Sequence, residues 1–275
     1  MGAKFSVSMS VYHQDRPEHF HRAFLSVVNQ TLMPSEVVLV VDGPVPKETR
    51  DIISCLKGNY SFLKVVEIKQ NKGHGNARRV GLDVCTNDII ALMDSDDISV
   101  IDRFELQYNF LSKNPNISLV GGQIEEFVGN TKNVVSKRCV PIEDELIKQF
   151  MKSRCPFNQM TVMFRKSAVI EAGGYKDFYH NEDYYLWIRM YLKNCKFHNL
   201  ESVLVKARID DKFYNRRGGL KYFQSECKIQ QILYKSKIIS IYKFILNICL
   251  RFILQVLIGS AIRGFIFKNL ARKNI

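Results

Sequence analysis

The sequence has no close pair of cysteines. Its seven cysteines stand at positions 55, 85, 139, 155, 195, 227 and 249, an odd number without any Cys-x-x-Cys spacing. This scatter argues against a zinc site and indicates reduced thiols in a cytosolic setting. The first ten residues also lack the apolar core of a secretory signal, so we expect the chain to stay in the cytoplasm.

Metal-ligand spacing is also missing among the histidines. His19 and His21 are two positions apart and so point to different faces of a helix. We interpret these and the remaining four as surface or locally hydrogen-bonded side chains: His13, His74, His180 and His198.

Acidic residues are scarce in the last quarter of the chain. Fifteen of the 40 Lys and Arg follow residue 200, against four of the 27 Asp and Glu, so most of the formal charge of +13 lies there. A nucleic-acid surface interleaves its basic residues with aromatic or polar readers, whereas these alternate with Ile, Leu and Phe. We therefore expect an anionic membrane surface as a partner, and no nucleic acid.

The residue pattern near the end of the sequence supports the expectation of a membrane surface. Between positions 238 and 266 the chain is mostly apolar, but Lys243, Asn247, Arg251 and Gln255 recur at intervals of four. These side chains share about 120° of one helical face. A membrane-spanning helix would not carry a charged stripe through its middle, while a helix lying in the membrane plane would need one. The open alternative is a soluble helix packed on the core.

Strand and helix signals alternate over the first hundred residues, which predicts an α/β fold with a parallel sheet. Apolar runs at 5–9, 36–41, 63–68 and 89–93 read as strands, with helical patterns between them. Asp15-Arg16-Pro17-Glu18 reads as a capping box that starts the first helix. Further on the pattern is less regular, with helices expected at 102–110, 143–151 and 182–192 and strands at 118–122 and 161–164.

Three carboxylates stand directly after the apolar run 89–93. Asp94, Asp96 and Asp97 follow a predicted buried strand, at the edge where an α/β sheet opens onto ligands. Like charges held this close are tolerated mainly around a cation, and Mg²⁺ or Mn²⁺ would complete its shell with phosphate oxygens. The alternative is an acidic turn that caps the next helix.

Two other predicted strands end in polar or aromatic side chains. Tyr12 follows the first strand and Asp42 the second, so in a parallel sheet both face the same edge as Asp94. An aromatic ring suits a nucleobase, and a lone carboxylate suits a ribose or base edge. Alternatively, Tyr12 fills the core and Asp42 shapes a turn.

Taken in order, these motifs resemble family 2 glycosyltransferases over about residues 4–210. The likeness is closest to small bacterial enzymes that build O-antigen, capsule or exopolysaccharide units. The motifs are Ser10-Val11-Tyr12-His13-Gln14-Asp15-Arg16-Pro17-Glu18, Ser26-Val27-Val28-Asn29-Gln30-Thr31, Val41-Asp42-Gly43, Asn71-Lys72-Gly73 with Ala77-Arg78, Asp94-Ser95-Asp96-Asp97, and Asn181-Glu182-Asp183 with Leu186-Trp187.

The resemblance implies a GT-A fold with a Rossmann-like mixed sheet and inverting transfer from a sugar nucleotide. It implies a catalytic domain at 1–215, with a nucleotide-sugar half to about residue 100 and an acceptor half after it. The charge and spacing described above give the remainder, 216–275, as a basic amphipathic membrane-associating tail. The resemblance further implies the following roles: Asp94 and Asp96 for Mn²⁺ or Mg²⁺, Asp94 also for ribose, Tyr12 and Asp42 for uracil or ribose, and Asp183 as general base with Glu182 beside it.

Four arginines are candidates for the diphosphate: Arg78, Arg208, Arg216 and Arg217. Glycines after Arg216-Arg217 would permit a loop that closes over donor, although a basic collar for the tail explains this pair equally. Asp183 also has an ordinary alternative, because acids are favourable in the first turn of a helix.

The resemblance gives an expected activity. We expect transfer of glucose or galactose from a UDP-sugar to a sugar on a polyprenyl diphosphate carrier, by an enzyme held peripherally on the inner face of the bacterial cytoplasmic membrane. Two alternatives are a non-catalytic lipid-bound scaffold and a magnesium-dependent haloacid-type phosphatase. The phosphatase needs a nucleophilic Asp after the first strand, where this chain has Ser10-Val11-Tyr12.

Overall fold

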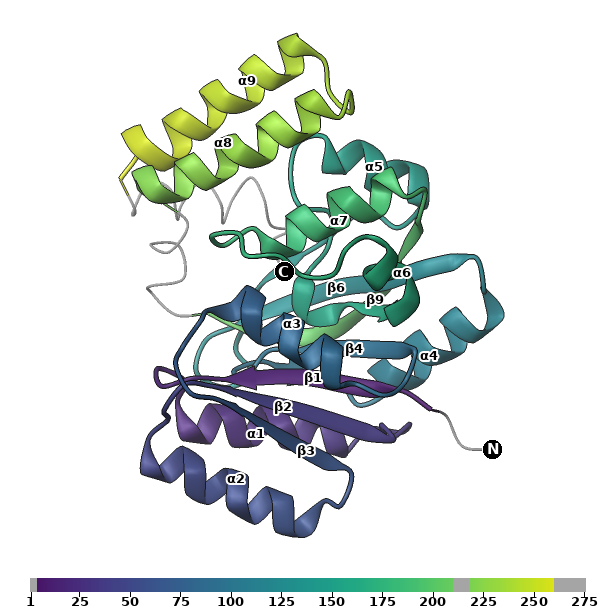
Figure 1. The fold of residues 1–275 in the computed structure, drawn as a ribbon, viewed down its shortest axis with the longest axis vertical. Helices are drawn as coiled ribbons and strands as arrows, with labels where there is room; N and C mark the ends of the chain where they lie inside the picture. The colour runs from purple at the N-terminus through teal and green to yellow at the C-terminus, as the bar shows by residue number, and fades with distance from the viewer. Residues whose placement is uncertain (1–3, 210–217, 260–275) are drawn as a thin grey trace.

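A single mixed sheet organises the computed structural model, which describes residues 4–209 and 218–259. Its strands lie in the order β3-β2-β1-β4-β8-β6-β9-β5, and β7 pairs with β6 (Figure 1). Four strands form the parallel part that the alternating pattern predicts. They are β1 (Ser6–Val11), β2 (Glu36–Asp42), β3 (Leu63–Ile68) and β4 (Ile89–Met93).

The rest of the sheet has mixed direction. Strand β8 (Met163–Arg165) runs antiparallel to β4 and to β6 (Ile117–Phe127), whereas β9 (Lys196–Arg208) runs parallel to β6. Short strands β7 (Val134–Arg138) and β5 (Ile98–Ser99) flank β6 and β9. The long strand β9 is absent from the sequence prediction, because His198, Asn199 and Glu201 interrupt its apolar pattern.

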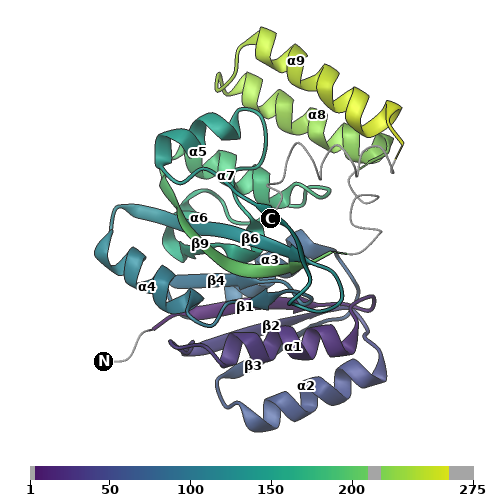
Figure 2. The same ribbon diagram turned by 180° about the vertical axis from the view of Figure 1, so that it is seen from behind.

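Helices cover both faces of the sheet (Figures 1 and 2). The strand alternation divides the core: Val37 and Leu39 pack with one set of helices, and Val38 and Val40 with the other. The first set is α1 (Pro17–Val28), α2 (Lys47–Asn59) and α4 (Arg103–Lys113). The second set is α3 (His74–Val84), α5 (Asp144–Met151), α6 (Lys166–Glu171) and α7 (Glu182–Leu192). The 3₁₀ turn η1 (Gln159–Thr161) precedes β8.

The start of α1 corrects one prediction. Helix α1 begins at Pro17 as expected, but no side chain caps it, so the capping box is wrong. Asp15 instead accepts hydrogen bonds from the Tyr12 backbone N–H at 3.0 Å and from the Ser95 hydroxyl at 2.8 Å. The Asp15 carboxylate therefore connects the loop after β1 to the acidic loop after β4, which is Asp94-Ser95-Asp96-Asp97.

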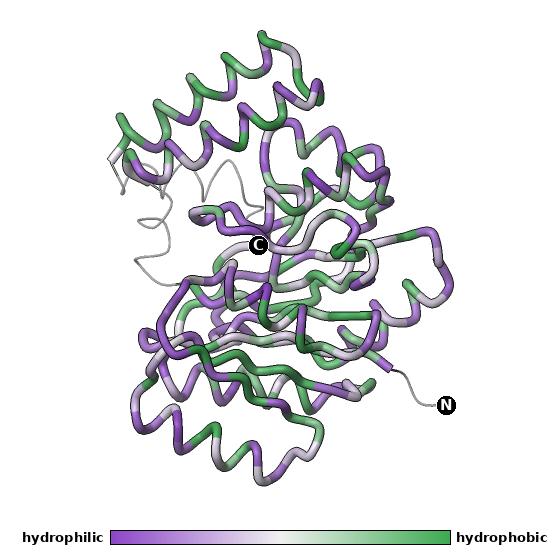
Figure 3. The backbone as a smooth tube through the Cα atoms, in the orientation of Figure 1, coloured by the Kyte–Doolittle hydropathy of each residue, from purple (hydrophilic) through white to green (hydrophobic). Residues whose placement is uncertain are grey.

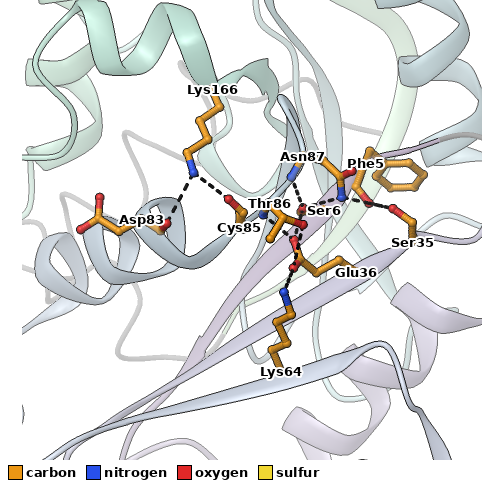
Figure 4. A network of polar contacts seen from close by, with 10 residues as sticks. All are labelled: Phe5, Ser6, Ser35, Glu36, Lys64, Asp83, Cys85, Thr86, Asn87 and Lys166. Carbon is orange, nitrogen blue, oxygen red and sulfur yellow. Dashed lines mark hydrogen bonds and ion pairs between the residues drawn. The ribbon is translucent and has the colours of Figure 1, made fainter.

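A polar network fixes the opposite, amino-terminal edge of the parallel strands (Figure 4). Glu36 is 4% exposed and accepts hydrogen bonds from Ser6, Lys64 and both the N–H and hydroxyl of Thr86. Burial alone would raise the pKa of Glu36, but these hydrogen bonds outweigh it and lower the pKa below its ordinary value. One ionised carboxylate thus joins β1, β2, β3 and the turn before β4.

The tail forms a helical hairpin, α8 (Leu220–Lys235) and α9 (Ile241–Phe252), followed by the π-helical turn η3 (Ile253–Leu257). The hairpin lies beside α5 and α7, at the far end of the molecule from α2 (Figures 1 and 2). The expected boundary at 215/216, together with Arg216 and Arg217, falls outside the described residues.

Most of the polar stripe on α9 faces the protein. Asn247 donates to Lys152 O at 2.9 Å and to Gln230 Oε1 at 2.7 Å, and Arg251 pairs with Glu226 at 2.6 Å. The stripe therefore fastens α9 to α8 and to the end of α5.

Apolar side chains of α9 and η3 are exposed as a consequence, and Figure 3 shows how hydrophobic this segment is. They are Ile241, Tyr242, Ile245, Leu246, Leu250, Phe252, Ile253 and Leu257. Among the described residues, no helix has the length and apolarity needed to cross a bilayer.

Candidate active site

The carboxyl ends of three parallel strands bring the residues that are predicted to bind a sugar nucleotide to one edge of the sheet. Val11 pairs with Val41, and Met9 pairs with Met93. Tyr12, Asp42 and Asp94 each lie at or just beyond these strand ends, so the prediction that they share an edge is confirmed.

Asp94 is held in place from α3. The buried guanidinium of Arg78 pairs with Asp94 Oδ1 and also donates to Ser8 O at 2.9 Å and Met93 O at 3.2 Å. The Arg78 side chain has no exposed surface, whereas Asp94 keeps a quarter of its side chain exposed. Arg78 thus lies beneath the acidic loop, where it orients Asp94.

The acidic loop is crowded with negative charge. Burial, followed by the charges of Asp96 and Asp94, raises the pKa of Asp97 well above its ordinary value. Burial also raises the pKa of Asp15 to about 6, with Asp94 adding to the rise. Such repulsion is what a divalent cation relieves, so this oxygen-rich set fits Mg²⁺ or Mn²⁺.

The protein supplies only some of the ligands that a metal ion at the acidic loop would need. Within residues 4–209 and 218–259, no three His, Cys, Asp or Glu side chains are grouped as a complete metal site. Magnesium commonly takes one or two carboxylates and fills its remaining positions with water and substrate phosphates. Asp94 and Asp96 match that incomplete type of site.

Arg208 lies next to the acidic loop at the end of β9. Its backbone N–H donates to Asp97 Oδ1 at 2.7 Å, and its Nε donates to Asp96 O at 3.0 Å. The guanidinium also stacks over Phe127. Of the two candidate arginines that the structure describes, Arg78 is buried beneath the loop and Arg208 lies partly exposed beside it, whereas Arg216 and Arg217 fall outside the described residues.

Asp42 organises the loop before α3. Its Oδ1 accepts from the Lys72 N–H at 2.9 Å, and its Oδ2 accepts from the Gly73 N–H at 3.0 Å. Asn71 also donates to Asp42 O at 3.2 Å. The carboxylate of Asp42 therefore couples the end of β2 to the start of α3, and any contact with uracil or ribose uses its remaining lone pairs.

Tyr12 lies half-buried in the loop after β1. Its hydroxyl donates to Gln14 at 3.3 Å, and its ring packs edge-on against His13 with 5.3 Å between the centroids. The ring is thus at the surface edge of the sheet and does not belong to the buried core.

Asp183 has the electrostatics of a general base near neutral pH. Burial, and then the charge of Glu182, raises the pKa of Asp183 to about 7. The Tyr184 N–H donates to Asp183 Oδ1 at 2.6 Å, and Cys155 Sγ lies 3.8 Å from Oδ2. A carboxylate with this pKa can accept a proton and release it again at physiological pH.

A histidine joins the two halves of the site. His74 Nδ1 is 2.8 Å from Glu182 Oε1, and His74 Nε2 is 3.8 Å from Asp94 Oδ1. The sequence predicts only a surface or local hydrogen-bonding role for His74 and a helix-capping role for Asp15, and it gives Cys155 no part in the site. The position of His74 directly after Asn71-Lys72-Gly73 was the signal that could have revealed it.

Comparisons with known proteins agree with this geometry. The model described as "Glycosyl transferase family 2" matches residues 6–177. A UDP-Gal:alpha-D-GlcNAc-diphosphoundecaprenol beta-1,3-galactosyltransferase of Escherichia coli is 35% identical, over 98% of this chain and 97% of the relative. An amylovoran biosynthesis glycosyltransferase of Erwinia amylovora is 36% identical, over 83% of this chain and 85% of the relative.

The fold has a solved counterpart. The crystal structure of S. aureus TarS 1–349 in complex with UDP-GlcNAc has a TM-score of 0.67 and 18% identity, covering 91% of this chain and 73% of that chain. This likeness establishes the predicted GT-A fold alone. The family match and the full-length relatives go further: the chain is a glycosyltransferase and belongs to glycosyl transferase family 2.

Proposed function

We propose that the chain transfers one hexose, galactose or glucose, from a UDP-sugar to a sugar on a polyprenyl diphosphate carrier, with inversion. The activity of the Escherichia coli relative supports this class of donor and acceptor, because the alignment covers nearly the whole of both chains. The proposal places the enzyme in the synthesis of a bacterial surface polysaccharide.

One observation carries the proposal. The acidic loop after β4 and the first turn of α7 face each other across His74, although they are far apart in the sequence. A nucleoside diphosphate at Asp94 and Asp96 would therefore have its sugar close to Asp183. Donor and base must be neighbours in this way for transfer to occur.

The residue roles follow from the chemistry. The acceptor hydroxyl loses a proton as its oxygen attacks the anomeric carbon, and Asp183 accepts that proton. Attack from the side opposite the diphosphate inverts the anomeric centre. Asp94 and Asp96 would hold Mn²⁺ or Mg²⁺, which when bound offsets the negative charge of the departing diphosphate. Arg78 orients Asp94, and Asp42 and Tyr12 border the nucleoside.

The test is an assay of purified wild-type protein with Mn²⁺, a panel of sugar nucleotides and a lipid-diphosphate GlcNAc acceptor. We expect transfer from a UDP-hexose, with Asp183→Asn lowering the rate by about 10²- to 10⁴-fold while UDP affinity is kept. Asp177→Asn, at an exposed carboxylate of the acceptor half, is the matched control. Wild-type protein that transfers no sugar from any donor would support the scaffold alternative.

We also propose that the chain is peripheral on the inner face of the cytoplasmic membrane, attached through the outer face of α9. The exposed apolar side chains of α9 and η3 would enter the interface, and the basic excess after residue 200 would attract anionic lipid. Such attachment would bring the acceptor half, beside which the hairpin lies, close to a lipid-linked acceptor (Figure 1).

A further inference from the structure

We propose that His74, on the donor half, is a positioning residue that fixes Glu182 and through it the first turn of α7, which carries Asp183. The inference rests on the proposed function, because it assigns Asp183 the role of base. It adds a residue that neither the family resemblance nor the comparisons assign.

The contact of His74 with Glu182 is short and largely protected from water. The distance between His74 Nδ1 and Glu182 Oε1 is 2.8 Å, and only 9% of the Glu182 side chain is exposed. Burial alone would raise the pKa of Glu182, but the hydrogen bond and the charge of His74 outweigh it and lower the pKa. An ionised carboxylate only accepts hydrogen bonds, so His74 donates through Nδ1.

The backbone around His74 is anchored on the donor side. Gly73 has φ of +86°, and its N–H donates to Asp42 at 3.0 Å, which sets the path of the chain into α3. On its other side, His74 Nε2 lies 3.8 Å from Asp94. The imidazole thus lies between Asp94 and Glu182, while Asp42 anchors the backbone just before it.

The next residue brings the two halves into close contact. A Cβ added at Gly75 would lie 3.1 Å from Glu182 Cβ and 3.3 Å from Glu182 Cγ. The start of α3 therefore leaves Glu182 little freedom to move. Because Glu182 immediately precedes Asp183, displacement of Glu182 would also displace the base and the charge that raises its pKa.

The two nitrogens of His74 can be tested separately. Asn carries its amide nitrogen at the position of Nδ1, whereas Gln extends its amide to the position of Nε2. We therefore expect His74→Asn to keep the bond to Glu182, and His74→Gln and His74→Ala to lose it. His21→Ala, an exposed histidine on α1, is the control.

Two readouts are measured on the full-length variants. The first is the rate of sugar transfer together with UDP·Mn²⁺ affinity. We expect His74→Ala and His74→Gln to lower transfer by about 10- to 100-fold with UDP affinity within twofold of wild type, and His74→Asn to recover transfer to within about threefold. The second is hydrogen exchange of the Tyr184 and Tyr185 amides, which should quicken in His74→Ala and return in His74→Asn.

Two results would overturn the inference. One is that His74→Asn is as impaired as His74→Ala in both readouts. The other is that UDP affinity falls as much as transfer, which would make His74 a donor-site residue. If wild-type protein transfers no sugar, the proposed function fails, and the exchange measurement still decides whether His74 fixes the first turn of α7.

Discussion

At the scale of single residues, the site depends on carboxylates whose proton affinities differ. Glu182 and Asp183 are adjacent, yet the pKa of Glu182 is lowered and the pKa of Asp183 is raised to about 7. Burial opposes the charge on both side chains, so the difference comes from their partners: His74 favours ionised Glu182, and ionised Glu182 disfavours ionised Asp183. One carboxylate is thereby kept charged while its neighbour can exchange a proton near neutrality.

This arrangement predicts the pH dependence of transfer. A base must be ionised, so the wild-type rate should fall as pH drops through about 7. Glu182→Gln removes the neighbouring charge but keeps an acceptor for His74, so the pKa of Asp183 should fall while remaining raised by burial. We expect the acidic limb of the kcat profile to move to lower pH by about one unit.

The control for that profile is Glu171→Gln, at an exposed position on α6. Its acidic limb should coincide with that of wild type. A Glu182→Gln profile that does not move, or moves to higher pH, contradicts the assigned coupling. His74 and Arg138 also contribute charge near Asp183, and both are unchanged in this comparison.

At the scale of elements, the two ends of the parallel strands are specialised differently. The carboxyl ends carry the acidic loop, where burial and then the neighbouring negative charges raise the pKa of Asp97, while the amino ends are joined by Glu36 and its hydrogen-bond donors (Figure 4). A buried carboxylate with four hydrogen bonds is satisfied, and it contributes to stability without a ligand.

The Glu36 network predicts a stability change. Glu36→Gln leaves the shape nearly unchanged but removes the charge that accepts from Lys64, so unfolding free energy should fall by about 1–3 kcal/mol at pH 7. Because the folded-state pKa of Glu36 is lowered, its contribution is present above the ordinary pKa of about 4.3 and is lost as pH falls through the folded-state value. Urea denaturation at several pH values measures this.

Glu48→Gln, on the exposed side of α2, is the matched control and should change stability by less than about 0.5 kcal/mol. If Glu36→Gln is equally harmless at pH 7, or if its cost grows as pH falls below 4, the network does not act as described.

The elements also show what the sequence could reveal. Strands β1 to β4 were predictable because apolar runs of strand length alternate with amphipathic helices, and α7 was predicted at its observed bounds. Strand β9 was not predictable, because its pairing with β6 overrides the polar interruption of its apolar pattern at Asn199 and Glu201. The capping box at Asp15 failed because Ser95, far along the chain, recruits the carboxylate.

The candidate site, too, has residues that the sequence predicts and contacts that it does not. Asp42, Asp94 and Asp183 could be named from motifs, since strand ends and helix starts fix where such side chains emerge. The link through His74 could be predicted only in part: its place directly after Asn71-Lys72-Gly73 puts it near the other motifs, but no local pattern identifies its partner Glu182 on another helix. The inward direction of the α9 stripe likewise depends on Glu226 and on Lys152 O, which no local pattern identifies.

At the scale of the whole molecule, the hairpin gives the protein an apolar end beside α5 and α7 (Figures 1 and 3). The buried stripe fixes which side of α9 faces outward, so the exposed side chains are a consequence of how α9 packs. An outer face of this kind would insert into the headgroup region without crossing it.

We expect the full-length protein to bind vesicles containing anionic phosphatidylglycerol, and Leu246→Glu with Leu250→Glu to weaken that binding by at least about 10-fold. Both side chains lie on the outer face of α9, away from Asn247 and Arg251, so the hairpin should still pack. Co-sedimentation with vesicles measures the effect.

Glutamate at Met33 and Ile170, two exposed apolar positions outside the hairpin, is the control and should leave vesicle binding within about twofold. Equal binding by the α9 variant and wild type would remove the support for attachment through this face. Binding to neutral vesicles as tight as to anionic ones would show that the basic excess plays no part.

Calorimetric titration of UDP with and without Mn²⁺ tests whether the carboxylates after β4 hold a divalent ion against a nucleoside diphosphate. We predict that Mn²⁺ tightens UDP binding to wild-type protein and to the exposed-site control Asp51→Ala, and that Asp94→Ala with Asp96→Ala abolishes this tightening and sugar transfer. A double variant with the wild-type response to Mn²⁺ and the wild-type transfer rate would show that these two carboxylates do not hold the ion.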